Sequence, residues 1–114
     1  MKSDKEIRWA GSSFADLLQF PAPMRREAGF QLGKVQEGQE PENWKPFDEV
    51  GAGTKEIRIR DAAGIYRVLY VAKFDDAIYV LHCFQKKTEE TAKHDKDITA
   101  IRYKEIIQKR KVNK

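Results

Sequence analysis

The sequence predicts a single α+β domain over residues 1–114, in which a strand and two helices precede a small antiparallel sheet and a basic helix follows it. Three observations predict this order. Apolar residues recur at helical spacing before residue 38, three stretches rich in β-branched and aromatic residues lie between 55 and 85, and isoleucines alternate with cations from about residue 95. A chain of this length buries one core rather than two, which predicts one domain.

The first residues predict a short strand followed by a short helix. The strand is centred on Ile7 and Trp9. Ser12 or Ser13 is placed to cap the helix, because a serine hydroxyl can accept a hydrogen bond from a free backbone N–H of the first turn. Pro21 is expected to end it.

A second helix is predicted from Pro23 to Gly38. Proline suits the first helical position, and glycine commonly follows the last one. Its apolar residues recur at near four-residue spacing: Met24, Ala28, Leu32 and Val35. The stretch 37–55 has two prolines and no sustained period, so it is predicted to be a loop. Trp44 and Phe47 are expected to anchor this loop on the core.

Three strands are predicted next, at 55–60, 65–74 and 77–85. The connections at 61–64 and 75–77 are short and polar or contain glycine, as hairpin turns do. The strands should therefore pair as an antiparallel meander, giving a sheet of three to four strands.

The last element is a predicted basic helix from about Asp95 to Lys111. Apolar residues are spread among its six lysines and arginines: Ile98, Ile101, Tyr103, Ile106 and Ile107. A polar helix beside a small sheet completes the α+β order.

Composition and charge exclude several classes of protein. The chain is 40% hydrophobic and 35% charged, which fits neither wholesale disorder nor a membrane span, and its N-terminus lacks the apolar core of a secretory signal. We expect it to remain in the cytoplasm, with no membrane partner. Residues 1–84 carry 12 Lys/Arg against 13 Asp/Glu, whereas residues 85–114 carry 10 against 5, and this gradient favours an anionic partner.

The motifs of metal and nucleotide chemistry are absent. The chain has no phosphate-binding glycine loop, no HExxH and only two histidines, so we expect no metal and no cofactor. Cys83 is the only cysteine and is expected to fill the core. His82 adjoins it, but consecutive strand residues point to opposite faces, which disfavours a Cys–His dyad.

Arg67 is the most informative residue, because it interrupts an otherwise apolar strand and an unpaired buried guanidinium is costly. It requires a partner or an open cleft. Pairing with Glu56 or Asp61 would make it a fastener of the sheet, and this alternative is left open beside a functional role.

Neighbouring strands of a meander can bring Arg58, Arg67 and Lys86 into one cationic patch with His82 and Phe84. Such a patch could hold a phosphodiester and stabilise the extra negative charge when an RNA 2′-hydroxyl attacks its own phosphate, without a metal. Phe84 could stack on a base. The alternatives are a solvated strand face for the arginines, a polar strand end for the lysines and a structural role for His82.

Several motifs together resemble the phage-derived HigB-type branch of the RelE/ParE toxin superfamily over roughly residues 5–108. They are KEIRIRDAAGIYRVLYV, then IYVLHCFQKKTEET, with WKPF ahead and a last helix containing Arg102 and Tyr103. The chain departs from the family pattern at Ala92, where a proline often follows the KKT segment, and it lacks a clear terminal catalytic tyrosine.

The resemblance implies a RelE-like fold and a toxin of a type II toxin-antitoxin system, an endoribonuclease that enters the ribosomal A site and cuts mRNA. It implies a helix-turn-helix antitoxin as partner and contact with operator DNA only through the antitoxin complex. By match to the motifs, Arg58 and Arg67 correspond to the strand cations of the family, and Lys86 and Lys87 correspond to its strand-end basic positions. With the cationic patch argued above, the expected catalytic residues are Arg58, Arg67, Lys86 and His82, and the expected RNA-binding residues are Lys55, Arg60, Phe84 and Lys87. The general base stays open between His82, for its ordinary pKa, and a lysine whose pKa is lowered by neighbouring cations.

Two other functions stay open. A sister branch with this architecture inhibits a DNA topoisomerase without cleaving RNA, although Arg67 and the lysine pair argue against that branch. The third possibility is an inactive phage-derived binding module.

Overall fold

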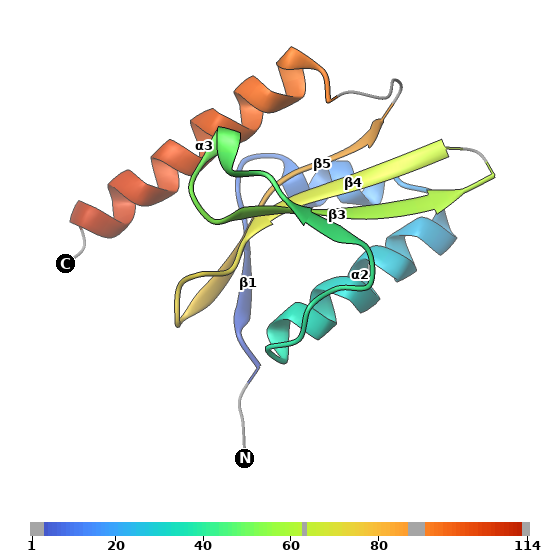
Figure 1. Ribbon diagram of the computed structural model, residues 1–114, viewed down its shortest axis with the longest axis horizontal. Coiled ribbons are helices and arrows are strands. Elements are labelled where there is room, and N and C mark those ends of the chain that lie inside the picture. The colour runs from blue at the N-terminus through green and yellow to red at the C-terminus, as the bar shows by residue number, and fades with distance from the viewer. Residues whose placement is uncertain (1–3, 63, 87–90, 113–114) are drawn as a thin grey trace.

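A computed structural model describes residues 4–62, 64–86 and 91–112 of the chain. It has the predicted α+β composition, with helices on both faces of one sheet (Figure 1). The helices are α1 (Ser13–Leu18), α2 (Ala22–Gln36) and α3 (Lys93–Val112), with a 3₁₀ turn η1 (Asp48–Val50). The strands are β1 (Glu6–Trp9), β2 (Trp44–Pro46), β3 (Thr54–Asp61), β4 (Gly64–Val71) and β5 (Ala77–Lys86).

The sheet has five strands in the order β1-β5-β4-β3-β2, so the prediction of three to four antiparallel strands is wrong. β3, β4 and β5 form the predicted antiparallel meander, whereas β1 pairs in parallel with β5. β2 lies within the stretch predicted as a loop. Three residues that include Pro46 show no alternation, and proline is tolerated there because β2 is an edge strand.

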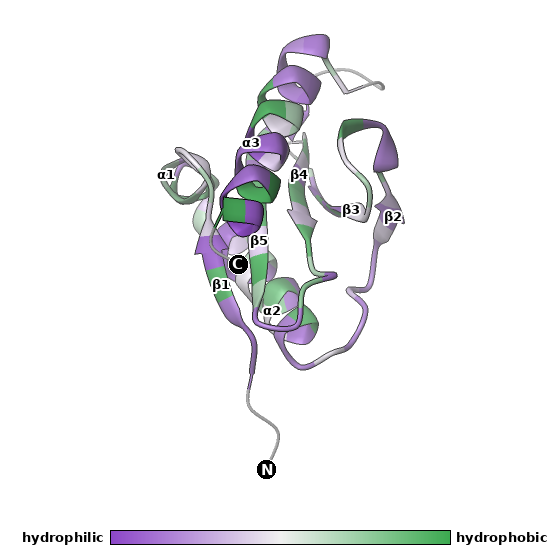
Figure 2. Ribbon diagram, turned by 90° about the vertical axis from the view of Figure 1, so that its left-hand side faces the viewer, coloured by the Kyte–Doolittle hydropathy of each residue, from purple (hydrophilic) through white to green (hydrophobic). Residues whose placement is uncertain are grey.

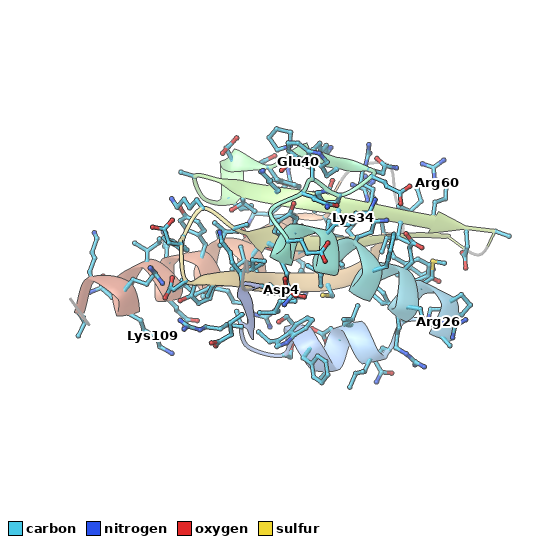
Figure 3. The ribbon with its side chains drawn as sticks, turned by 90° about the horizontal axis from the view of Figure 1, so that it is seen from below. Asp4, Arg26, Lys34, Glu40, Arg60 and Lys109 are labelled. Carbon is cyan, nitrogen blue, oxygen red and sulfur yellow. The ribbon has the colours of Figure 1, made fainter. Side chains whose placement is uncertain are left out.

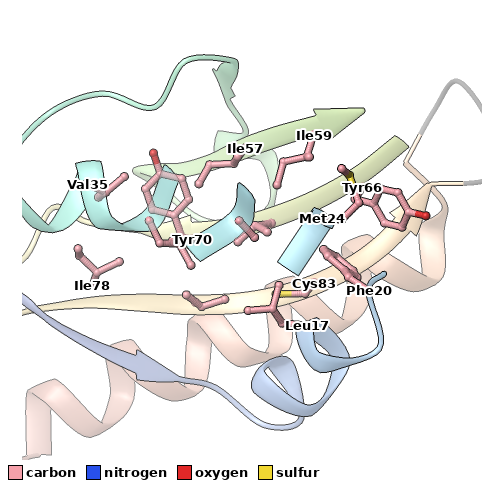
Figure 4. Close-up of a cluster of buried hydrophobic side chains, with 14 residues drawn as sticks. Leu17, Phe20, Met24, Val35, Ile57, Ile59, Tyr66, Tyr70, Ile78 and Cys83 are labelled. Atoms are coloured by element: carbon pink, nitrogen blue, oxygen red, sulfur yellow. The ribbon is translucent and has the colours of Figure 1, made fainter. Parts of the chain in front are cut away.

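One face of the sheet is apolar and is covered by α1 and α2. Alternation places Ile57 and Ile59 of β3 on this face with Val68 of β4. Leu17 of α1 and Val35 of α2 cover them (Figure 4). Cys83 lies in this core at 2% exposure, as predicted, and burial raises the pKa of its thiol to about 12.

The opposite face carries α3, which is largely hydrophilic (Figure 2) and packs there through buried Ile106 together with several polar contacts. Arg102 donates to the backbone oxygen of Leu81 at 2.8 Å and to Ser12 Oγ at 3.0 Å. The guanidinium lies directly over Gly11, where φ is +51° and a Cβ would come within 2.6 Å of it. Tyr103 Oη donates to the backbone oxygen of Ala52 at 2.6 Å. These contacts fix α3 across β5.

A register shift in β5 decides which residues share the α3 face. Leu69 pairs with His82 but Tyr70 pairs with Val80, so Leu81 is an inserted residue. As a result Leu81 lies under α3, and the even-numbered residues that follow it lie on the same face.

Candidate active site on the cationic sheet face

The functional side chains lie in rows across β3, β4 and β5, on the face that carries α3. Paired residues of adjacent strands project from the same face, and one row is Arg58, Arg67 and Phe84. The row toward the β3–β4 turn is Arg60, Ile65 and Lys86, and the row on the other side is Glu56, Leu69 and His82. We call the five basic residues of this face the cationic cluster: Lys45, Arg58, Arg60, Arg67 and Lys86.

Glu56 is the centre of the cationic cluster. Its side chain is fully buried, and Oε1 accepts a short hydrogen bond from Nη1 of Arg67, which is 1% exposed. Lys45 Nζ lies 3.8 Å and Arg58 Nε 3.9 Å from the same oxygen. One carboxylate therefore balances cations from three neighbouring strands.

Arg67 thus has Glu56 as the partner that the sequence offered, and it is buried rather than lining an open cleft. Burial lowers the pKa of its guanidinium, and the charge of Glu56 opposes this. Glu56 Oε2 and Arg67 Nε are buried and form no hydrogen bond within the described part of the chain. The pair fastens β3 to β4, so Arg67 acts on a ligand only through its charge or after displacement of Glu56.

The exposed members of the cluster are the side chains that a ligand can reach. Those of Lys45 and Arg58 are 46% and 36% exposed. Arg60 is exposed, and Figure 3 shows it at the opposite end of the molecule from Lys109. Together they offer an anion a positive surface above the buried ion pair.

Lys86 is half-buried at the end of β5 and has a pKa below its ordinary value. Burial is the main cause, and the charges of Arg67, Lys45 and Arg58 add to it while Glu56 opposes it. A lysine of lowered pKa has a larger fraction of neutral amine, which is the form that can accept a proton. Of the two possibilities for the base, the environment therefore favours the lysine.

His82 is buried at 6% exposure and is bonded to α3. Its Nε2 lies 2.7 Å from Asp95 Oδ1, and its ring stacks on Phe84 with centroids 4.9 Å apart. Because a carboxylate only accepts hydrogen bonds, the Nε2 atom carries the proton. Nδ1 then carries the lone pair that could accept a proton, but this atom is buried. His82 anchors the first turn of α3 and does not face solvent as a base.

Acidification should weaken this anchor. Burial lowers the pKa of His82 below 6.5 although Asp95 opposes the shift, so the unfolded chain binds the proton more readily. The contribution to stability is present above pH 6.5 and is lost as the pH falls through the lower pKa of the folded state. We expect the urea midpoint to fall between about pH 7.5 and about pH 5.5.

In His82→Gln the urea midpoint should fall much less over this pH range. In His94→Gln, a substitution of an exposed histidine, it should fall as in the parent. An equally steep fall in His82→Gln would assign the pH dependence to other groups.

The remaining predicted RNA-binding residues are not all brought together. Phe84 is half-exposed in the row of Arg67. Lys55 projects from the opposite face, where its Nζ lies 3.2 Å from Glu40 and over the ring of Trp44. It therefore cannot share an anion with the cationic cluster. Lys87 lies outside the described residues.

Two residues of the site were missed from the sequence. Lys45 belongs to WKPF, but its position beside Glu56 follows from the pairing of β2 with β3, which no periodicity indicated. Asp95 was taken only as the start of the last helix, and its bond to His82 depends on how α3 docks.

Within residues 4–62, 64–86 and 91–112, no three His, Cys, Asp or Glu side chains are grouped so that they could hold a metal ion. In the same ranges, no helix is both long and apolar enough to span a bilayer.

Comparison with known proteins identifies the family. The profile of the family described as "Phage derived protein Gp49-like (DUF891)" matches residues 15–104, which include most of α1, all of α2 and of the meander, and the first half of α3. No curated protein matches the chain. The chain belongs to the Gp49-like family of phage-derived proteins, a RelE/ParE-like toxin family.

Proposed function

We propose that this protein is the toxin of a type II toxin-antitoxin system, of the HigB type with a RelE-like fold, and that it cuts mRNA on the ribosome. The family supports a toxin. The observation that carries the nuclease is the cationic cluster, in which basic side chains of four adjacent strands converge on one sheet face.

The proposed reaction is an attack of the RNA 2′-oxygen on the adjacent phosphorus. The 2′-hydroxyl proton passes to the neutral amine of Lys86 as the 2′-oxygen bonds to phosphorus, the bond from phosphorus to the 5′-oxygen breaks, and the leaving 5′-oxygen takes a proton from solvent water. Arg58 and Lys45 are reachable by the non-bridging oxygens and stabilise their charge in the transition state. Glu56 holds the arginines in place, and Arg67 adds its positive charge from below.

The proposed partners are the ribosome with its mRNA and a helix-turn-helix antitoxin, all in the cytoplasm. The antitoxin would cover the cationic cluster or bind along the N-terminal helices. Large apolar side chains exposed on α1 and α2 support the second surface: Phe14, Leu18 and Phe30.

One observation favours the topoisomerase inhibitor as the second candidate. Arg67, the strand cation most suggestive of catalysis, is buried against Glu56, as expected of a structural ion pair. A protein of this family that has no catalytic activity would keep such an ion pair for stability.

Mapping of mRNA 5′ ends after induction separates the two functions. The nuclease produces new ends clustered within coding regions and no SOS response. An SOS response without new ends would reject the nuclease in favour of the inhibitor, and growth without either effect would indicate an inactive module.

A further inference from the structure

A hollow of about 600 Å³ lies beside the outer half of β5, between α1 and α3. β1 pairs with β5 only as far as Val80, so β5 continues to Lys86 with no strand on that side among the described residues. We call this hollow the β5-edge pocket. Its lining residues include Asp16, Gln19, Phe84, Gln85, His94 and Ile98.

The β5-edge pocket adjoins the cationic cluster. Phe84 lines the pocket and is also the direct cross-strand partner of Arg67. Lys86, two residues further on, projects from the same face as Phe84. A nucleotide whose phosphate lies over the cluster therefore has the pocket within reach of its base.

The lining of the pocket suits an uncharged aromatic ligand. Phe84, half-exposed and stacked on His82, forms the aromatic wall that a ligand can reach. Phe20 and Tyr66 also line the pocket, but they are buried at 4% and 3% exposure. Among the described residues, no lysine or arginine lines it. The cations needed for a phosphate lie next to the pocket, and the half-exposed ring of Phe84 offers a base a stacking surface within it.

Polar groups at the pocket wall can read the edge of a base. Asp16 is half-buried, and one of its oxygens, Oδ2, accepts a hydrogen bond from Ser12 Oγ at 2.8 Å. A carboxylate only accepts, so it favours a base with an exocyclic amino group. Gln19 and His94 are exposed beside it and offer further donors or acceptors.

We infer that the β5-edge pocket receives one nucleobase of the RNA and that Asp16 selects bases with an exocyclic amino group, namely adenine, cytosine and guanine, over uracil. This inference rests on the proposed function, because it names the part of the substrate that the pocket holds. Asp16 and Gln19 are specificity-determining residues, whereas the cationic cluster acts on the phosphate.

Binding of non-cleavable RNA tests the pocket independently of cutting. The probes are 2′-O-methyl trinucleotides that differ only in the central base, titrated into the purified isotope-labelled protein and followed by backbone amide shifts. We expect the parent to bind the best amino-bearing base about tenfold more tightly than uracil, with shifts at Gln19, Gln85 and Ile98. Asp16→Asn should abolish that preference, and Asp75→Asn, in the exposed β4–β5 turn, should keep it.

Cut-site mapping in cells supplies the second readout. Asp16→Asn and Gln19→Ala should change the base frequencies at the cut, whereas Asp75→Asn should leave both the growth arrest and the base frequencies unchanged. If the parent cuts no mRNA while the binding preference depends on Asp16, the pocket stands and the proposed activity fails. If the parent cuts and neither variant alters the binding preference or the cut-site bases, the pocket is rejected and the activity stands. Absence of trinucleotide binding, or shifts confined to residues outside the pocket, also rejects it.

Discussion

Replacing Glu56 by Gln is expected to lower the free energy of unfolding by about 3–5 kcal/mol, the largest effect of any single substitution at the site. The carboxylate is fully buried and is the counter-charge for Arg67, Arg58 and Lys45. Its loss leaves Arg67, at 1% exposure, as a buried cation beside two others. Urea denaturation of the purified variant measures the change.

Arg67→Met provides the matched control. Glu56 would still have Lys45 at 3.8 Å and Arg58 at 3.9 Å, so we expect this variant to lose less stability than Glu56→Gln. The double variant should be more stable than Glu56→Gln alone, because the buried charge has been removed from both sides of the pair. A cost below about 0.5 kcal/mol for Glu56→Gln would show that the carboxylate is not the counter-charge described here.

Replacing Lys86 by Ala is expected to abolish growth arrest and to reduce mRNA cleavage on purified ribosomes by about 10²–10⁴-fold, the usual contribution of a general base. The side chain is half-buried at the end of β5 and forms no ion pair with the described residues, so stability should change by about 0.5 kcal/mol or less. Lys93→Ala, at a lysine 88% exposed on the first turn of α3, should leave the arrest intact.

The pH dependence separates a base from a simple cation. Because the pKa of Lys86 lies below 10.5, the neutral amine increases as the pH rises toward that lowered value, and the cleavage rate should rise with it. Lys86→Arg keeps the charge but not the titration, and should lose both the rate and its rise. Full activity in Lys86→Arg would leave Lys86 as a phosphate-binding cation only.

The meander could be predicted from the sequence because its signals are local. Ile57 and Ile59 alternate with charged residues, and short turns join β3 to β4 and β4 to β5, which makes the strands neighbours. The place of β1 could not be predicted in this way, since a parallel pairing joins residues about 70 positions apart and leaves no periodic pattern. β2 was missed because three residues are too few to alternate.

The shared face of Arg58, Arg67 and Lys86 followed from the same hairpins, because turn length sets the register and the register sets the face. The burial of Arg67 and of His82 could not be predicted. Arg67 is covered because Glu56 lies beside it, and His82 is covered because the inserted Leu81 and Asp95 place it under α3. The sequence offered Glu56 as a partner of Arg67, whereas the contact of His82 with Asp95 arises from the docking of α3 on β5, which no local pattern determines.

The chemistry of the cut ends tests the central claim most directly. Purified ribosomes programmed with an mRNA are incubated with the protein, and the termini of the fragments are identified. Attack by the 2′-oxygen leaves a 2′,3′-cyclic phosphate on the upstream fragment and a 5′-hydroxyl on the downstream one, and Lys86→Ala should strongly reduce both. Fragments with a 3′-hydroxyl and a 5′-phosphate, or an mRNA that stays intact, would contradict the assignment of the cationic cluster as an RNA-cleaving site.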